Sequence, residues 1–430
     1  MFRASSRARI LAVAVAAAAA LTLAACQSGG NASTASSADP AKVTGTLRVL
    51  VPSYPASNEG KAALDKVVAQ FNKKYPKVTV EPDFATFGTL NQKISTSIAG
   101  GQGYDVLVTG VGWIPPFASK NVFADLSAFG VTPSSLGKST NAALVPAAEY
   151  KGKVYAVPLI AAPKPLALRK SAFEKAGLDP NKPPQTMAEL KADAEKLTVK
   201  DGSGNITQPG FDFWAGPGGY RQNFVALLGS RGVPLYDKAG KAQFAGSAGV
   251  ETLDWMKSMV GGVEKYGAQN PGKSPMVTTG EAAMGFTGAY VDCSANGIGQ
   301  AACDDLKYFN LKDKQAAMFT GGQLASVGQT SKLKQAAWAF IQAMTTPAAE
   351  ADIAALNFAV PAAKNASNAP IVKSNPASAF SAANLSQAVF EGGASNWLDL
   401  RPKFDSGIDD ALLGKSSSQD VLTSLKQQSQ

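Results

Sequence analysis

Short β-rich runs alternate with amphipathic segments between Thr46 and Thr109. The sequence predicts strands over Thr46–Val51 (TLRVLV), Val78–Pro82 (VTVEP) and Tyr104–Thr109 (YDVLVT), and helices over Gly60–Lys74 and Leu90–Ala99. In the first helix, Leu64, Val67, Val68 and Phe71 follow the i, i+3, i+4, i+7 spacing of one apolar face. Strands that alternate with helices form βαβ units around a parallel sheet, so the chain is predicted to be α/β.

Ligands of such sheets bind at the carboxyl ends of the strands. Those ends carry Ser53, Tyr54, Phe84 and the loop from Thr109 to Trp113. Tyr54 and Trp113 are therefore candidate ligand-binding residues.

The N-terminal segment is predicted to be a lipoprotein signal peptide over residues 1–25. Arg3, Arg7 and Arg9 precede an apolar run, and Leu23-Ala24-Ala25-Cys26 closes it. This ending resembles a lipobox, in which the thiol of Cys26 is diacylated and becomes the first residue after cleavage. The alternative is a transmembrane helix, but the run is shorter than the roughly 20 residues that a bilayer requires. We expect the mature protein on the extracytoplasmic face of the cell membrane, held by lipid on Cys26.

Residues 26–42 are predicted to be a flexible tether, because they are built from Ser, Ala, Gly and Asn without apolar periodicity. The remainder, residues 43–430, is long for one core and suggests two lobes. Its Lys and Arg residues are scattered along the chain, which favours a solvated surface over a nucleic-acid interface.

Cys293 and Cys303 are predicted to form a disulfide, since they lie ten residues apart and the compartment is oxidising. A metal site is the alternative, but the chain contains no histidine to complete one. We expect neither a metal nor a cofactor.

The lack of histidine also removes Ser-His-Asp and Cys-His nucleophiles. Paired carboxylates remain as an alternative, and Asp105, Asp125 and Asp399 are candidates, although no spacing pairs them. We therefore expect a binding protein without catalytic residues.

Four stretches in a fixed order resemble the extracellular solute-binding proteins of family 1, the carbohydrate-type group that serves ABC importers. They are Gly152–Thr198, Gly280–Tyr290 (GEAAMGFTGAY), Gly321–Pro361 with a helix over SKLKQAAWAFIQAMTTPAAE, and Trp397–Leu425. The resemblance covers nearly all of the chain that follows the tether.

The resemblance implies a two-lobed, type II periplasmic-binding-protein fold, in which each lobe is a mixed sheet flanked by helices. Carried onto this sequence, lobe one comprises residues 43–157 and 316–346, and lobe two comprises residues 158–313 and 347–430. Hinges would fall near Pro158, Lys312–Gln315 and Thr346–Pro361, and closure around ligand would be a motion of rigid lobes.

Sugar binding requires flat aromatic faces and planar polar groups. Trp113, Trp214, Tyr290 and Trp397 lie in polar or Gly-rich contexts and are candidates for stacking, with burial in a core as the alternative for each. Trp255 and Trp338 lie within amphipathic helices and are predicted to be core residues.

The resemblance adds candidates for polar and backbone contacts to the ligand: Gly321, Gly322, Gln323, Arg221 and Arg401. For the two arginines the alternative is a surface ion pair. The sequence also departs from the family pattern, because Ala167–Ser171 replaces an aromatic pair and an Asn-Lys-Asp.

The resemblance implies capture of a solute, a mono- or oligosaccharide, and its delivery to an ABC permease in the membrane by a monomer. The alternatives are a non-sugar solute such as a polyol, a glycerol phosphate or a polyamine, and a secreted carbohydrate-active hydrolase or lyase.

Overall fold

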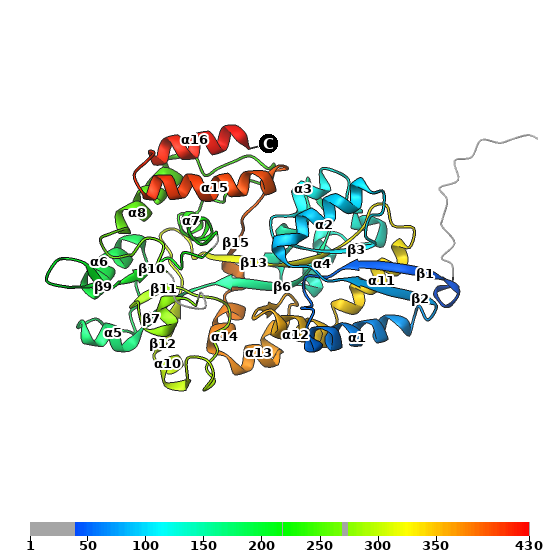
Figure 1. Ribbon diagram of the computed structural model, residues 1–430, viewed down its shortest axis with the longest axis horizontal. Helices are drawn as coiled ribbons and strands as arrows, with labels where there is room; N and C mark the ends of the chain where they lie inside the picture. Colours follow the sequence, from blue (N-terminus) through cyan, green and yellow to red (C-terminus); the bar gives the residue numbers. More distant parts are fainter. Residues whose placement is uncertain (1–38, 217, 269–273, 430) are drawn as a thin grey trace, which may run out of the picture. The chain divides into compact units, whose positions relative to one another are not determined.

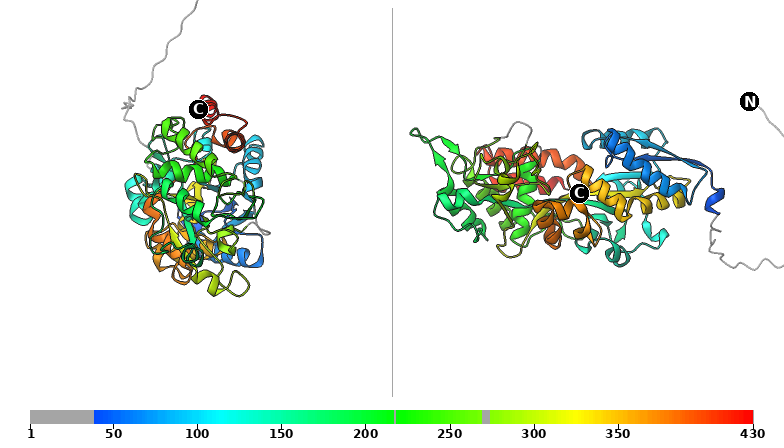
Figure 2. Two further views of the ribbon diagram at one scale, coloured as in Figure 1. Left: turned by 90° about the vertical axis from the view of Figure 1, so that its left-hand side faces the viewer. Right: turned by 90° about the horizontal axis from the view of Figure 1, so that it is seen from below.

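The computed structural model describes residues 39–216, 218–268 and 274–429 (Figures 1 and 2). The predicted signal peptide, Cys26 and most of the predicted tether lie outside the described residues. The end of the tether is described, and Pro40–Lys42 form a short 3-10 helix.

A seven-stranded sheet has the order β14-β6-β13-β3-β1-β2, with β15 beside β13. Its strands are β1 (Gly45–Leu50), β2 (Val78–Asp83), β3 (Val106–Gly110), β6 (Val157–Lys164), β13 (Met318–Val327), β14 (Val360–Pro361) and β15 (Ala388–Val389). The strands β2, β1 and β3 are parallel, as the βαβ pattern predicts. β13 runs antiparallel to β3 and to β6, which makes the whole sheet mixed.

The helices occupy the following ranges: α1 (Asn58–Asn72), α2 (Phe87–Ala99), α3 (Ile114–Ala118), α4 (Pro133–Ser139), α5 (Lys170–Lys175), α6 (Met187–Leu197), α7 (Gly219–Ser230), α8 (Ser247–Met259), α9 (Met276–Thr279), α10 (Gln300–Asp304), α11 (Lys334–Met344), α12 (Pro347–Leu356), α13 (Pro370–Ser374), α14 (Pro376–Ala383), α15 (Trp397–Leu412) and α16 (Ser418–Gln428). Both helices predicted in the first βαβ units are present. α1 begins after Ser57, whose side chain accepts from the Gly60 N–H, and it buries Leu64, Val67 and Phe71 as predicted.

In the part of the chain that the structure describes, every helix is too short or too polar to cross a bilayer.

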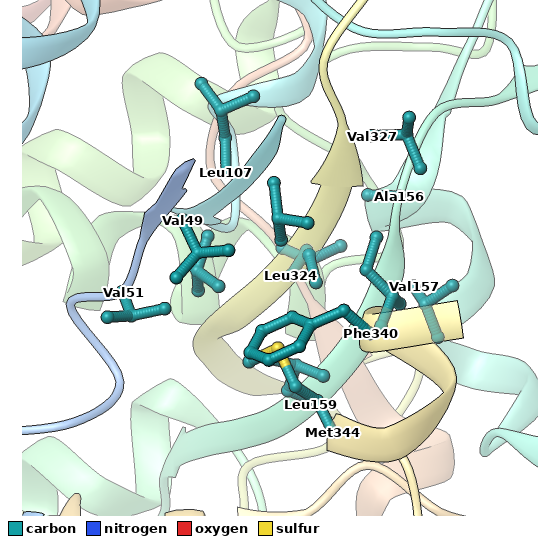
Figure 3. Close-up of a cluster of buried hydrophobic side chains, with 14 of the residues drawn as sticks. Val49, Val51, Leu107, Ala156, Val157, Leu159, Leu324, Val327, Phe340 and Met344 are labelled. Carbon is teal, nitrogen blue, oxygen red and sulfur yellow. The ribbon is translucent and has the colours of Figure 1, made fainter. Parts of the chain in front are cut away.

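One hydrophobic core, called here the first core, surrounds the large sheet. Figure 3 shows side chains of β1, β3, β6 and β13 meeting Phe340 and Met344 of α11. Leu47, Val49, Leu159 and Phe340 have no exposed surface. Burial of such apolar side chains is the main source of stability for this half of the fold.

A second core surrounds a four-stranded sheet of order β10-β11-β7-β12. Its strands are β7 (Leu166–Arg169), β10 (Phe211–Asp212), β11 (Met284–Phe286) and β12 (Leu306–Phe309). α7, α8, α15 and α16 pack together on this side, and in Figure 2 the orange and red α15 and α16 lie against the green helices. α7 is buried nearly all round, so it is a central element rather than a surface helix.

β6 and β13 connect the two cores. The Val157 end of β6 and the Leu324–Val327 end of β13 belong to the first core. Phe319 of β13, and Leu166 just beyond β6, belong to the second. Figure 1 shows this antiparallel pair running from the β1–β3 region toward β7 and β11. Two cores, each with a mixed sheet, confirm the predicted two-lobed α/β fold, while the boundaries given above for the lobes stay a prediction.

The stretch SKLKQAAWAFIQAMTTPAAE, predicted as one helix, forms two. α11 ends at Met344 and α12 begins at Pro347, which occupies the first turn of the new helix. Proline lacks the N–H that a continuous helix would need, and the Thr346 side chain accepts from the Ala349 N–H to cap α12. Thr346 and Pro347 therefore account for the break between α11 and α12.

The predicted disulfide is confirmed. Cys293 and Cys303 are joined, with Cα atoms 5.6 Å apart. Cys303 lies in α10 and is 3% exposed, so the bridge fastens the loop of residues 294–302 to a small buried cluster.

Candidate ligand-binding site

A cavity of about 480 Å³ lies where elements of both cores converge. Its wall is formed by the end of β3 and the loop after it, one face of β6 and β13, the start of α7 and the first turns of α15. The lining residues are Phe87, Gly110, Val111, Trp113, Ile160, Ala162, Gly218, Arg221, Gln222, Phe319, Gly321, Gly322, Gln323, Asn357, Glu391, Arg401 and Asp405.

The strand pair β6 and β13 forms the floor of the cavity. Opposite residues of an antiparallel pair share a face, and every second residue along a strand returns to that face. Gln323 is paired with Ile160, Gly321 with Ala162 and Phe319 with Lys164. Lys164 therefore occupies the next position on the cavity-facing side, beyond Ile160 and Ala162.

Three polar residues close one end of this floor in a ring of hydrogen bonds. The Ser53 hydroxyl donates to Gln323 Oε1 (2.5 Å), Gln323 Nε2 donates to Asn357 Oδ1 (3.0 Å), and Asn357 Nδ2 donates to the Ser53 carbonyl (2.8 Å). The ring fixes the two amides in one orientation while leaving each with unused hydrogen-bonding capacity. Such held amide groups suit a ligand that carries hydroxyls.

Arg221 organises the opposite wall. Its Nε donates to Glu391 Oε2 (2.9 Å), and its Nη1 donates to Asp405 Oδ1. Arg221 is 3% exposed, so removing both carboxylates would leave an uncompensated buried charge, whereas removing one leaves the arginine paired with the other. A Cβ on Gly218 would lie 2.6 Å from Arg221 Nη2, which shows why this position is a glycine.

The Trp113 ring meets Phe87 edge to face, with ring centroids 6.1 Å apart. Gly110 makes this possible, because a Cβ there would lie 3.0 Å from Phe87 and 3.1 Å from Trp113 Nε1. The Arg401 guanidinium carbon lies 5.8 Å from the centroid of the Trp113 ring, within the range of a cation–π contact. The site thus combines aromatic surface with planar polar groups.

Gln222 supplies an unused acceptor. Its Oε1 is buried and has no hydrogen-bond partner in the described chain, although the residue lines the cavity. An unpaired buried acceptor costs about 1–3 kcal/mol. A hydroxyl of a bound ligand would satisfy it.

The structure brings six of the predicted ligand-binding residues to the wall; these are Trp113, Arg221, Gly321, Gly322, Gln323 and Arg401. It places Tyr54 and Trp397 in the two cores, 1% and 0% exposed, and Trp113, although it lines the wall, also belongs to the first core and is 2% exposed. Burial raises the pKa of Tyr54. Trp214 and Tyr290 are not among the residues that line the cavity. The Trp214 ring lies under the Lys164 ammonium, 4.2 Å from ring centroid to Nζ, and Tyr290 contacts Phe358 with ring centroids 5.2 Å apart. None of these placements tests ligand binding, which stays a prediction for all ten.

Several wall residues were not predicted from the sequence: Phe87, Gln222, Asn357, Glu391 and Asp405. Weak signals existed for three of them. Gln222 follows Arg221, Asp405 lies one helical turn after Arg401, and Asn357 falls within the predicted hinge region at Thr346–Pro361. Glu391 could not be found in this way, because only the folded chain brings it to Arg221.

The acidic and cysteine side chains of residues 39–216, 218–268 and 274–429 form no group of three that could hold a metal ion. The chemistry of the wall is that of hydrogen bonding, aromatic contact and fixed charge.

A cavity at the junction of two α/β lobes is the arrangement of a solute-binding protein. The model of the family described as bacterial extracellular solute-binding protein matches residues 54–351. This chain belongs to that family.

Curated relatives are distant. A binding protein of Brucella abortus (strain 2308) is 26% identical over 226 residues, which are 53% of this chain and 52% of that protein. The match thus spans about half the length of that relative. The diacetylchitobiose-binding protein DasA of Streptomyces coelicolor is 24% identical over 330 residues, 74% of this chain and 73% of DasA.

Solved structures agree on the fold. The cyclic α-maltosyl-1,6-maltose binding protein of Arthrobacter globiformis has a TM-score of 0.71 at 20% identity, covering 90% of this chain and 98% of that one. The sugar-binding protein MalE of Xanthomonas citri has a TM-score of 0.72 at 16% identity, covering 90% and 96%. These likenesses confirm the predicted type II fold.

Proposed function

We propose that this chain captures a mono- or oligosaccharide in the cavity and delivers it to an ABC permease in the membrane. The observation that carries the proposal is the composition of the wall, which combines the exposed ring of Phe87, packed on Trp113, with the held amides of Gln323 and Asn357. A buried acceptor on Gln222 lies in the same wall. Sugars offer apolar C–H faces and many hydroxyls, which these groups complement. DasA and the structural neighbours named above bind sugars according to their names, which supports the same class of ligand.

The ligand-binding residues that we propose are the six predicted residues of the wall, together with Phe87, Gln222 and Asn357. Tyr290 and Trp214 would contact only a ligand long enough to extend beyond the described wall. No cofactor or metal enters the proposed function, and the protein would act as a monomer.

A lipid on Cys26 would hold the protein at the extracytoplasmic face of the membrane. This part of the proposal rests on the sequence alone. Replacing Cys26 by serine should release the protein into the medium. A Cys26→Ser protein that still sediments with membranes would overturn the anchor.

A thermal-shift screen with a carbohydrate panel tests the proposed function. At a hundredfold excess of ligand over its dissociation constant, binding stabilises the folded state by about 2.7 kcal/mol. One family of sugars should raise the melting temperature of the wild-type protein. If only polyols, glycerol phosphates or polyamines raise it, the saccharide is the wrong class of solute.

An enzyme would change its ligand. Glu391 and Asp405 are the carboxylates of the wall, and both bind Arg221. Intact mass measurement of oligosaccharides after incubation separates the two functions, because a binding protein leaves every mass unchanged, whereas a hydrolase or lyase yields shorter products.

A further inference from the structure

Two cationic side chains at the cavity make no hydrogen bond to an acceptor. Arg401 lines the wall from α15, and Lys164, opposite Phe319 at the end of β6, lies just beyond the described wall on the side of the strand pair that faces the cavity. Neither side chain makes a hydrogen bond or an ion pair with any described residue. Their contacts are with aromatic rings, Lys164 with Trp214 and Arg401 with Trp113.

The acids nearby are already engaged. Glu391 lies close enough to Lys164 to favour its charged form, but its carboxylate accepts from Arg221 Nε. Asp405 lies one turn from Arg401 on α15 and accepts from Arg221 Nη1. Both carboxylates of the wall thus accept hydrogen bonds from Arg221 and none from Lys164 or Arg401, although Asp405 also interacts electrostatically with Arg401. Together the three cations and two carboxylates leave one positive charge in excess.

Lys164 is partly desolvated. Its burial lowers the pKa of its ammonium to about 8, and the nearby Arg221 acts in the same direction, while Glu391 acts against it. A half-buried cation without an acceptor is unfavourable unless a ligand supplies one. The sugar hydroxyls of a neutral ligand are weak partners for two such groups, whereas hydrogen bonds between charged partners are roughly twice as strong.

We propose that the saccharide carries an oxyanionic substituent, a carboxylate or its equivalent, that Lys164 and Arg401 bind. This inference rests on the proposed function of saccharide capture and names the class of saccharide. The planar guanidinium of Arg401 can donate two parallel hydrogen bonds to a carboxylate, and the ammonium of Lys164 adds a point charge. The cation–π contact with Trp113, 5.8 Å from guanidinium carbon to ring centroid, places the Arg401 guanidinium at the wall.

Isothermal titration of a matched pair of ligands tests the inference. Digalacturonate and galactobiose have the same ring number and differ in their carboxylates, and a sulfated disaccharide serves as a second oxyanion. We expect the wild-type protein to bind one of the acidic ligands at least about tenfold more tightly than the neutral one. The acidic ligand that binds identifies the source of the oxyanion, a uronate or a sulfate ester.

Lys164→Gln and Arg401→Gln should each reduce this acidic preference by about tenfold. Lys61→Gln removes an equal charge from an exposed position of α1 and should leave the preference unchanged. Binding of the acidic ligand should also weaken as the pH rises from 7 to 9.5, because Lys164 loses its proton, and this weakening should be absent in Lys164→Gln. The charged groups that face Lys164 are Glu391 and Arg221.

Equal affinity of the wild-type protein for neutral and acidic disaccharides would overturn the inference while leaving saccharide capture intact. An acidic preference that survives both glutamine substitutions would overturn it as well. Failure of neutral and acidic saccharides alike to bind would overturn the proposed function together with the inference.

Discussion

Gly112 and Gly392 approach each other so closely that a Cβ on Gly392 would lie 2.4 Å from the Cα of Gly112. Gly112 belongs to the loop after β3 that carries Trp113, and Gly392 follows Glu391. Both backbones have positive φ, 85° and 91°, which glycine adopts without steric cost. The contact holds the loop that carries Trp113 against the segment that carries Glu391, and both of these residues line the cavity.

Gly392→Ala should lower the affinity for the saccharide by about tenfold, because a displacement of about 1 Å in a positioned site is worth that much or more. The added methyl group would force the loop of Gly112 away from Glu391. Titration of the ligand that the thermal-shift screen identifies measures the effect.

The matched control is Gly204→Ala. Gly204 has φ 84°, and a Cβ there would meet no atom within 4 Å. Both variants carry the cost of a left-handed alanine, about 1–2 kcal/mol, but only Gly392→Ala crowds the site. Equal affinities of the two variants would show that the contact between Gly112 and Gly392 does not matter for binding.

Gln222→Leu should reduce affinity without reducing stability. The substitution removes the buried Oε1, which has no partner in the described chain, and so it relieves an unsatisfied acceptor in the unliganded protein. A ligand hydroxyl would then lose its partner, which costs about 1–3 kcal/mol of binding free energy.

Urea unfolding and titration calorimetry together check this prediction, with Gln419→Leu on the exposed face of α16 as the control. A fall in the free energy of unfolding of Gln222→Leu as large as the fall in binding free energy would assign Gln222 a structural role instead.

The first βαβ units could be predicted from the sequence because their signals are local. The apolar spacing of α1 and the β-rich runs of β1, β2 and β3 depend on residues close together in the chain. β13 has no such local signal, since its role depends on pairing with β6 and β3, which are far away in sequence. Only the resemblance to solute-binding proteins indicated that segment.

The site was less predictable for the same reason. The Gly-rich and polar surroundings of Trp397 in sequence suggest exposure, yet its ring packs against Tyr236 and Phe404 of the second core. Tyr54 follows a strand at the binding edge but turns into the first core. Whether an aromatic residue stacks on a ligand or fills a core is decided by tertiary packing, which sequence context does not record.

The Cys293–Cys303 bridge should contribute about 2–3 kcal/mol to the free energy of unfolding, because it closes a short loop in the unfolded chain. Cys293→Ala combined with Cys303→Ala should lower the urea midpoint accordingly. A reducing agent should lower the wild-type midpoint to the same value and leave the double variant unchanged. Rapid alkylation of both thiols in the folded, non-reduced protein would show that the bridge is absent.

Glu350 should make stability fall as the pH rises. It is 3% exposed, its Oε2 accepts from the Ala363 N–H (2.9 Å), and burial raises its pKa from 4.5 to about 8. A carboxyl whose pKa is raised by folding favours the folded state fully below its unfolded pKa, near 4.5, and loses that contribution as the pH rises through 8. Since each pKa unit corresponds to about 1.4 kcal/mol, the full loss between 4.5 and 8 is on the order of 5 kcal/mol.

Glu350→Gln isolates this contribution, because the amide keeps an acceptor for Ala363 and cannot ionise. Urea unfolding from pH 5 to pH 9 should show the variant gaining stability relative to wild type as the pH rises from 5 toward 8, with a constant difference above 8. Glu195→Gln, at an exposed position of α6, should track wild type throughout. A constant difference in free energy of unfolding between Glu350→Gln and wild type over this range would contradict the prediction. It would mean that Glu350 keeps one protonation state and that groups other than a bound proton offset the cost of its burial.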